Sequence, residues 1–209
     1  MPLRLDLAEP RIDLGPLTTA LAGGACAVIP TDTVYGLICD AALPEACERL
    51  SALKRRDARR PSTVMFASVE TAAARLLAPL DDMLAGRARR LLARGATVLI
   101  PNPDGHYVHL CGDEPQRIGV RVSAFPPVLA AVIDAVGAIL ATSANLHGGS
   151  DPRTLAEVPA AIAAGCAVVV DGGPAHAGRA STVLDLCRPE PVILREGALA
   201  TADALALIA

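Results

Sequence analysis

Short aliphatic segments that end abruptly at Gly, Pro or hydroxyl-bearing residues recur along the whole chain. The segments 26–29, 138–141 and 167–170 are each long enough for one buried strand and too short for a helix. Segments with a helical pattern lie between most of them, for example 44–54 and 126–136. This alternation predicts an α/β fold, α+β-like in its order, whose mixed β-sheet is flanked by helices.

Hairpin-like stretches at 96–122 and 181–195 add the antiparallel part of the expected sheet. We expect strands over 3–7, 26–29, 63–67, 96–100, 107–110, 118–122, 138–141, 167–170, 181–185 and 192–195. We expect helices over 16–22, 44–54, 69–77, 81–94, 126–136 and 154–165, with a weak one from 201. Residues 30–37 are interpreted as a polar loop at the end of a buried strand, which is where open α/β sheets bind ligands.

The length of 209 residues suits one domain spanning 1–209, and the 52% hydrophobic content with only 2% aromatic residues predicts an aliphatic core. Charges interrupt the N-terminal apolar run, and no later apolar stretch reaches membrane-spanning length. The six cysteines form no C-x-x-C pair and are interpreted as reduced core residues. We therefore expect a soluble cytoplasmic protein.

A cationic segment, Lys54 to Pro61, interrupts a chain whose formal net charge is −3. Five of the eight residues in this segment are Lys or Arg, and Lys54 is the only lysine among the 19 lysine and arginine residues. An ammonium is a rotatable point charge that can follow a phosphate, whereas a guanidinium is a rigid fork. The segment is interpreted as an anion site or, alternatively, as a solvated basic loop.

Three predicted strands end in small hydroxyl or amide side chains. These side chains can donate hydrogen bonds to phosphate or carboxylate oxygens without filling the space that a ligand needs. They are Thr31 and Thr33, then Thr142, Ser143 and Asn145, and finally Ser181 and Thr182. Each group alone is equally typical of an ordinary turn.

No motif for covalent catalysis or for a protein-bound metal stands out in the chain. His106, His109 and Cys111 could suggest a metal triad, but an alternating strand would divide them between two faces, so we expect no metal ligands there. Neither a P-loop nor a G-x-S-x-G elbow is present. A site in this protein would therefore act by positioning and charge.

Taken together, the motifs resemble the YrdC-like threonylcarbamoyl-AMP synthases over about residues 15–200. The resemblance rests on the following motifs in order: Pro30-Thr31-Asp32-Thr33-Val34-Tyr35-Gly36-Leu37, Lys54-x-Arg56 with Arg60-Pro61, Arg121-Val122, Ser143-Ala144-Asn145, Asp171-Gly172-Gly173-Pro174, Ser181-Thr182-Val183-x-Asp185 and Leu194-Arg195-x-Gly197. It implies the short, single-domain form, with a twisted mixed sheet around a concave cationic cleft.

The resemblance also implies a reaction that joins L-threonine, bicarbonate and ATP, carried with Mg²⁺, into L-threonylcarbamoyl-adenylate and releases pyrophosphate. The product serves modification of adenosine 37 of tRNA, so tRNA or a tRNA-modification complex is a candidate partner. By position in the motifs, Lys54 and Arg56 look like the catalytic cations. The ATP side would comprise Arg56, Arg60, Arg117, Asn145, Arg153 and Arg195, and the threonine side Thr33, Arg121, Ser143 and Ser181.

The chain departs from the family pattern at several positions. Asp57 stands where the family has proline, Met65 where its long members have histidine, and Ser123 where it has proline after R-x. The P-G-P-x-T pattern is replaced by residues 93–97. Two alternatives therefore stay open: a paralogue that forms another carbamoyl-adenylate, and a diverged module that binds RNA or a nucleotide. Net negative charge and the presence of only two Tyr and two Phe residues argue against RNA binding.

Overall fold

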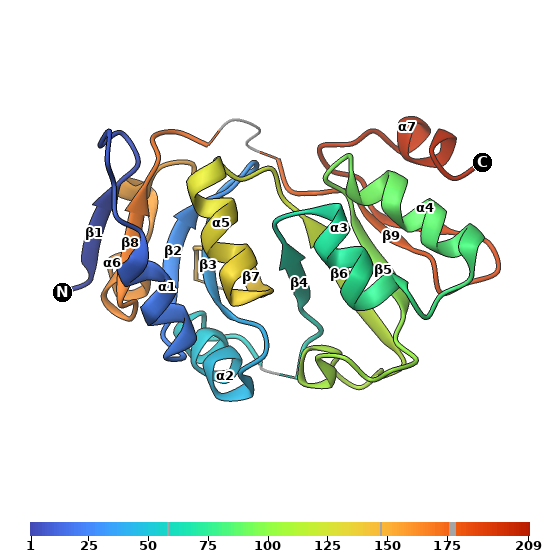
Figure 1. The fold of residues 1–209 in the computed structure, drawn as a ribbon, viewed down its shortest axis with the longest axis horizontal. Helices are drawn as coiled ribbons and strands as arrows, with labels where there is room; N and C mark the ends of the chain where they lie inside the picture. The colour runs from blue at the N-terminus through green and yellow to red at the C-terminus, as the bar shows by residue number, and fades with distance from the viewer. Residues whose placement is uncertain (58, 147, 176–178) are drawn as a thin grey trace.

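The computed structural model describes residues 1–57, 59–146, 148–175 and 179–209, so Ala58 of the cationic segment lies outside the described residues. The described residues form one ten-stranded sheet in the order β1-β8-β2-β3-β7-β4-β6-β5-β9-β10 (Figure 1). The strands are β1 (Leu3–Asp6), β2 (Ala27–Pro30), β3 (Tyr35–Asp40), β4 (Thr63–Phe66), β5 (Thr97–Pro101), β6 (Arg117–Val122), β7 (Ile139–Ser143), β8 (Val168–Asp171), β9 (Val183–Asp185) and β10 (Val192–Arg195).

The sheet is mixed, as the alternation of segments predicted. The pairs β1–β8, β2–β8, β4–β6 and β5–β9 are parallel, and the other five pairs are antiparallel. The two predicted hairpin regions are confirmed, since β5 pairs antiparallel with β6 and β9 with β10. The first strand lies at one edge of the sheet, next to β8.

Helices cover the two halves of the sheet (Figure 1). They are α1 (Gly15–Ala22), α2 (Pro44–Leu53), α3 (Val69–Ala72), α4 (Asp82–Leu92), α5 (Pro127–Val136), α6 (Ala160–Ala164) and α7 (Thr201–Ala206). Short turns of other helix types span Ala73–Leu77, Val108–Leu110 and Leu155–Glu157. Helices α1 and α5 pack together over β2 and β3, and α3 and α4 lie over β6 and β5.

The core is aliphatic and consists of two clusters that share the strands. Ala27 and Ile29 of β2 belong to one cluster with Leu17 of α1, while Val28 belongs to the other. This division follows from the two-residue period of side chains along a strand. Five of the six cysteines are buried and all six are free, as the sequence predicted.

Two helices begin or end at residues that favour helix ends. The Ser68 hydroxyl caps α3 by accepting a 3.0 Å hydrogen bond from the backbone N–H of Thr71. Helix α5 ends at Gly137, whose φ of 96° lies in the left-handed region that glycine tolerates.

Three sequence-based predictions are wrong. Residues 30–37 are not one loop, because the turn is limited to 31–34 and β3 begins at Tyr35 as a fully buried strand. The expected strand at 107–110 is instead a 3₁₀ turn that follows Tyr107, whose φ is 49°. The expected helix at 154–165 is divided into a 3₁₀ turn and α6, because Pro159 lacks the N–H that a continuous helix requires.

Within the described ranges, no helix is long and apolar enough to cross a membrane.

Candidate active site

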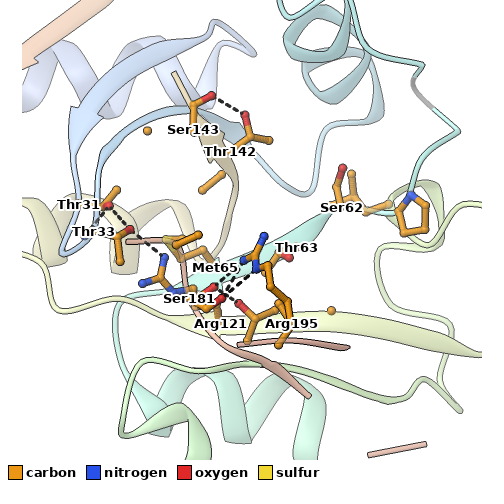
Figure 2. Close-up of a pocket in the computed structure, with 18 of the residues that line it drawn as sticks. Thr31, Thr33, Ser62, Thr63, Met65, Arg121, Thr142, Ser143, Ser181 and Arg195 are labelled. Carbon is orange, nitrogen blue, oxygen red and sulfur yellow. Dashed lines mark hydrogen bonds between the residues drawn. The ribbon is translucent and has the colours of Figure 1, made fainter. Parts of the chain in front are cut away.

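A cavity of about 430 Å³ lies on the sheet and gathers side chains from segments far apart in the sequence (Figure 2). It contains seven of the predicted site residues: Thr33, Arg56, Arg117, Arg121, Ser143, Ser181 and Arg195. The cavity also contacts apolar side chains, among them Met65 at the position of a histidine in the long family members. Hydroxyls and four arginines therefore surround one cavity, which agrees with the predicted concave cationic cleft.

The turn between β2 and β3 carries two hydroxyls into the cavity. The Thr31 hydroxyl donates a 2.7 Å hydrogen bond to the carbonyl of Val34, and it also accepts one of 3.2 Å from the Thr33 N–H. The Thr31 and Thr33 hydroxyls lie 3.2 Å apart. These bonds close the turn and fix Thr33, which is only 5% exposed, at the cavity wall.

Arg121 comes from β6 and is only 7% exposed. Its Nη2 atom donates to both carboxylate oxygens of Asp32 at 2.9 Å, and its Nε atom donates to the carbonyl of Gly95 at 3.3 Å. Its Nη1 atom lies 3.5 Å from the Thr33 hydroxyl oxygen. Burial lowers the pKa of Arg121, and the charge of Asp32 acts in the opposite direction.

Ser181 is held by one hydroxyl and one arginine. Its Oγ lies 2.8 Å from the Thr97 Oγ1, and Arg195 Nη2 donates to its backbone carbonyl at 2.8 Å. Arg195 is exposed on β10 while its guanidinium reaches the cavity (Figure 2). The pairing of β5 with β9 brings Thr97 and Ser181 together, although they are 84 residues apart in the chain.

Lys54 does not line the cavity, although Ser143 does. Lys54 is 4% exposed, and its ammonium donates to the Ser143 carbonyl and donates a 2.8 Å hydrogen bond to Asn145 Oδ1. Ser143 Oγ donates to the same Asn145 oxygen at 2.8 Å. Burial, followed by the charge of Arg56, lowers the pKa of Lys54 to about 8.

The cationic segment divides into an inner and an outer part. Arg56 lines the cavity, and its guanidinium donates to Ser62 Oγ at 3.2 Å and to the Pro61 carbonyl at 2.6 Å. Asp57 faces solvent and pairs with Arg59 at 3.2 Å. The carboxylate that replaces the family proline therefore neutralises an exposed arginine, and it leaves Arg56 at the cavity.

Arg117, at the start of β6, is fixed by two carboxylates. Its Nη1 atom lies 3.2 Å from Asp185 Oδ2, and its Nη2 atom donates to Glu114. Asp185 is 1% exposed and accepts a further bond from Arg188 at 3.1 Å. This network holds the Arg117 guanidinium at the cavity wall.

Besides Lys54, three predicted site residues do not line the cavity: Arg60, Asn145 and Arg153. Arg60 and Arg153 are both exposed, and neither lines the cavity. Asn145 lies behind Ser143 and contacts Lys54, and its amide donates to Asp151 Oδ1 at 3.1 Å. The roles of all these residues stay predictions.

Several residues that the sequence did not single out build the site. Tyr35 joins two of the motifs, because its hydroxyl donates to the Gly173 carbonyl at 2.7 Å and accepts from the Gly172 N–H at 3.0 Å. Thr182, which the sequence did single out, does not line the cavity, and its Oγ1 accepts a 2.9 Å hydrogen bond from the Gly197 N–H, which connects this segment to the C-terminal motif. Asp32, between the two threonines of its turn, is the missed residue that its motif could have revealed.

No group of three or more His, Cys, Asp or Glu side chains in the described parts of the chain could hold a metal ion. The expectation of no metal ligands at His106, His109 and Cys111 stays a prediction, and in the structure His109 Nε2 donates a 2.9 Å hydrogen bond to the Ala41 carbonyl. Asp151 is the one carboxylate among the described residues that line the cavity.

Comparisons with known proteins identify relatives of this chain. Residues 19–197 match the family model Sua5_yciO_yrdC, described as "Telomere recombination". A "Threonylcarbamoyl-AMP synthase" of Xanthomonas axonopodis pv. citri is 33% identical over 165 residues, which cover 77% of this chain and 86% of that protein. One of Bacillus subtilis is 29% identical over 171 residues, 81% of this chain and 49% of the relative, so the chain spans about half of that longer protein.

The fold also matches solved structures. The P. abyssi protein Sua5, solved in complex with L-threonine, superposes with a TM-score of 0.80 and 25% sequence identity. The match covers 100% of this chain and 61% of that protein.

Proposed function

The chain belongs to the Sua5/YciO/YrdC family, and on that premise we propose that it joins L-threonine, bicarbonate and ATP into L-threonylcarbamoyl-adenylate. The observation that carries this proposal is the single cavity in which the hydroxyls of Thr33, Ser143 and Ser181 meet four arginines. The threonine-bound relative and the synthases among the curated relatives support the choice of substrate.

The reaction needs positioning and charge more than a nucleophilic side chain. The amine of threonine combines with bicarbonate, loses water and becomes a carbamate. A carbamate oxygen then attacks the α-phosphorus of ATP, the bond to the β-phosphate breaks, and pyrophosphate leaves. Negative charge develops on the transferred and leaving phosphates, and preorganised cations stabilise it.

The arginines at the cavity match this demand. Arg56 and Arg195 would bind the phosphates. Arg117 would face the ATP side of the cavity, held in position by the carboxylates of Glu114 and Asp185. Arg121 and Thr33 would bind the carboxylate end of threonine. Lys54 would hold Ser143 and Asn145 in place through the hydrogen bonds of its ammonium, and it would add positive charge next to the cavity.

Mg²⁺ fits this site as a companion of the triphosphate. Mg²⁺ commonly keeps several waters and binds one or two carboxylates together with substrate phosphates, and Asp151 is the carboxylate available at the cavity. The ion would neutralise charge on the β- and γ-phosphates.

An alternative role in RNA binding has less support from the structure. Tyr35 and Phe66, half of the four Tyr and Phe residues, are 0% exposed and cannot stack on bases. The adenylate product would instead pass to a complex that modifies adenosine 37 of tRNA, which makes tRNA an indirect partner.

A direct test incubates the purified protein with ATP, Mg²⁺, bicarbonate and single amino acids and measures pyrophosphate. We expect release with L-threonine, dependence on bicarbonate, and a loss of more than about tenfold in Arg56→Ala. The matched control Arg89→Ala removes an exposed arginine of α4 and should retain the full rate. Release with another amino acid and none with threonine would instead establish a paralogue with a different substrate.

A further inference from the structure

The guanidinium of Arg121 is held through only part of its donor set. Arginine has five N–H donors in a planar fork. Asp32 occupies Nη2, and the Gly95 carbonyl accepts from Nε. Among the described residues, Nη1 has only the long 3.5 Å contact with Thr33. Since Thr33 and Arg121 both line the cavity, Nη1 is the nitrogen left to face a ligand.

Asp32 is itself fixed in place. Ser123 Oγ donates a 2.6 Å hydrogen bond to Asp32 Oδ1, and Ser123 is only 1% exposed. A proline at this position, as in the family pattern, would have no hydroxyl to donate. The serine of this chain therefore adds a bond to the carboxylate that orients Arg121.

The negative charge of Asp32 also stabilises the buried guanidinium of Arg121. Arg121 is buried, and a buried cation without a partner is strongly destabilising. Asp32 does not line the cavity, so its contact with Arg121 can stay intact while a ligand occupies the cavity.

We propose that Asp32 and Ser123 are positioning residues, which hold Arg121 by Nη2 so that Nη1, beside the Thr33 hydroxyl, binds the carboxylate of the amino-acid substrate. The identity of that substrate rests on the proposed function, whereas the orientation of Arg121 by Asp32 does not. Neither residue would touch the reacting atoms.

The kinetic test uses Asp32→Asn, which keeps the size of the side chain and removes its charge. We expect the KM for L-threonine to rise roughly tenfold or more and the KM for ATP to change less than about twofold. Ser123→Ala should shift the threonine KM in the same direction by a smaller factor, and it provides the test if Asp32→Asn does not fold. Asp134→Asn, which alters an exposed aspartate on α5, is the matched control.

Two kinetic results would overturn the proposal. An unchanged threonine KM in the folded variants would show that Arg121 needs neither residue. An equal rise of both KM values would show a general structural role instead of a role at the amino-acid end.

A second measurement does not depend on catalysis. In protein labelled with ¹⁵N-arginine, the ion pair should slow rotation of the Arg121 guanidinium, so that its Nη–H signals are observed by NMR in the wild type and lost in Asp32→Asn. If the wild type releases no pyrophosphate with threonine, the proposed function fails while this measurement still decides the positioning role. Identical Arg121 signals in both proteins would contradict it.

Discussion

The ammonium of Lys54, a buried residue, lies 2.8 Å from Asn145 Oδ1 and also donates to the carbonyl of Ser143 at the end of β7. This contact joins two motifs that are 91 residues apart in the chain. The only lysine of the chain therefore does not line the cavity itself but supports Ser143, which does.

Replacement of this lysine by arginine should damage the site although the charge is kept. The planar guanidinium of Lys54→Arg is larger than the ammonium and cannot donate to the Ser143 carbonyl and Asn145 from the same position. We expect kcat/KM for ATP to fall roughly tenfold to a hundredfold, measured by pyrophosphate release. Arg55→Lys, an exposed neighbour, is the control. Full activity in Lys54→Arg would mean that a compact ammonium is not required.

The pH dependence of kcat/KM for ATP should reflect the ionisation of Lys54. Burial and the charge of Arg56 lower the pKa of Lys54 to about 8, so the free enzyme loses this positive charge as the pH rises through that value. We expect kcat/KM for ATP to decrease above pH of about 8, because this parameter reports ionisations of the free enzyme. Lys54→Arg should remove the decrease, and a wild-type profile that stays flat to about pH 9.5 would contradict the assignment.

The stability of the fold should change with pH in the opposite direction. Between the folded pKa of about 8 and the ordinary value of 10.5, the unfolded chain binds more protons at Lys54 than the folded protein does. The Lys54 contribution to the free energy of unfolding should therefore rise with pH across this window. The difference between wild type and Lys54→Met in urea unfolding at several pH values isolates this contribution. A difference that does not vary with pH would show that the lysine titrates normally.

The hydroxyl of Tyr35 should contribute measurably to stability. In Tyr35→Phe the Gly172 N–H and the Gly173 carbonyl lose a partner, and we expect the free energy of unfolding to fall by about 1–3 kcal/mol. Urea unfolding measures this change, with Tyr107→Phe as a hydroxyl deletion elsewhere. No loss of stability would indicate that water replaces the hydroxyl.

Gly197 lies where two backbone segments approach each other too closely to leave room for a side chain. A Cβ atom at this position would lie 2.2 Å from the Ala180 carbonyl oxygen and 2.5 Å from the carbonyl carbon of Ser181. Gly197→Ala should therefore destabilise the protein by about 1–3 kcal/mol or more and displace Ser181. Gly86→Ala, in the middle of α4, has room and should stabilise by about 0.5–1 kcal/mol. Thermal unfolding of the two variants checks both signs, and equal effects would contradict this explanation.

Much of the fold could be predicted from local sequence patterns. Aliphatic segments and helix caps identified nearly all strands and the longer helices, because burial and capping act over a few neighbouring residues. Such patterns were insufficient for β3, where Gly36 and the preceding hydroxyls looked like a continuing loop. That strand exists because β2 and β7 lie on both sides of it.

The candidate site was predictable to a similar extent. The motifs identified seven side chains that meet at the cavity, since each motif marks a strand end or a charged loop. They did not reveal that Lys54 is buried, because a run of cations usually indicates a solvated surface. Nor did they reveal the bond from Ser123 to Asp32, whose partners are 91 residues apart and meet only in the folded sheet.

The proposed formation of a carbamoyl-adenylate from threonine can be tested by following the carbon of bicarbonate into the product. The wild-type protein is incubated with ATP, Mg²⁺, L-threonine and ¹³C-bicarbonate, and the products are analysed by mass spectrometry. We expect an L-threonylcarbamoyl-AMP species that carries the ¹³C label, in amounts that match the pyrophosphate released. Pyrophosphate without any labelled adenylate, or no turnover of threonine, would contradict it.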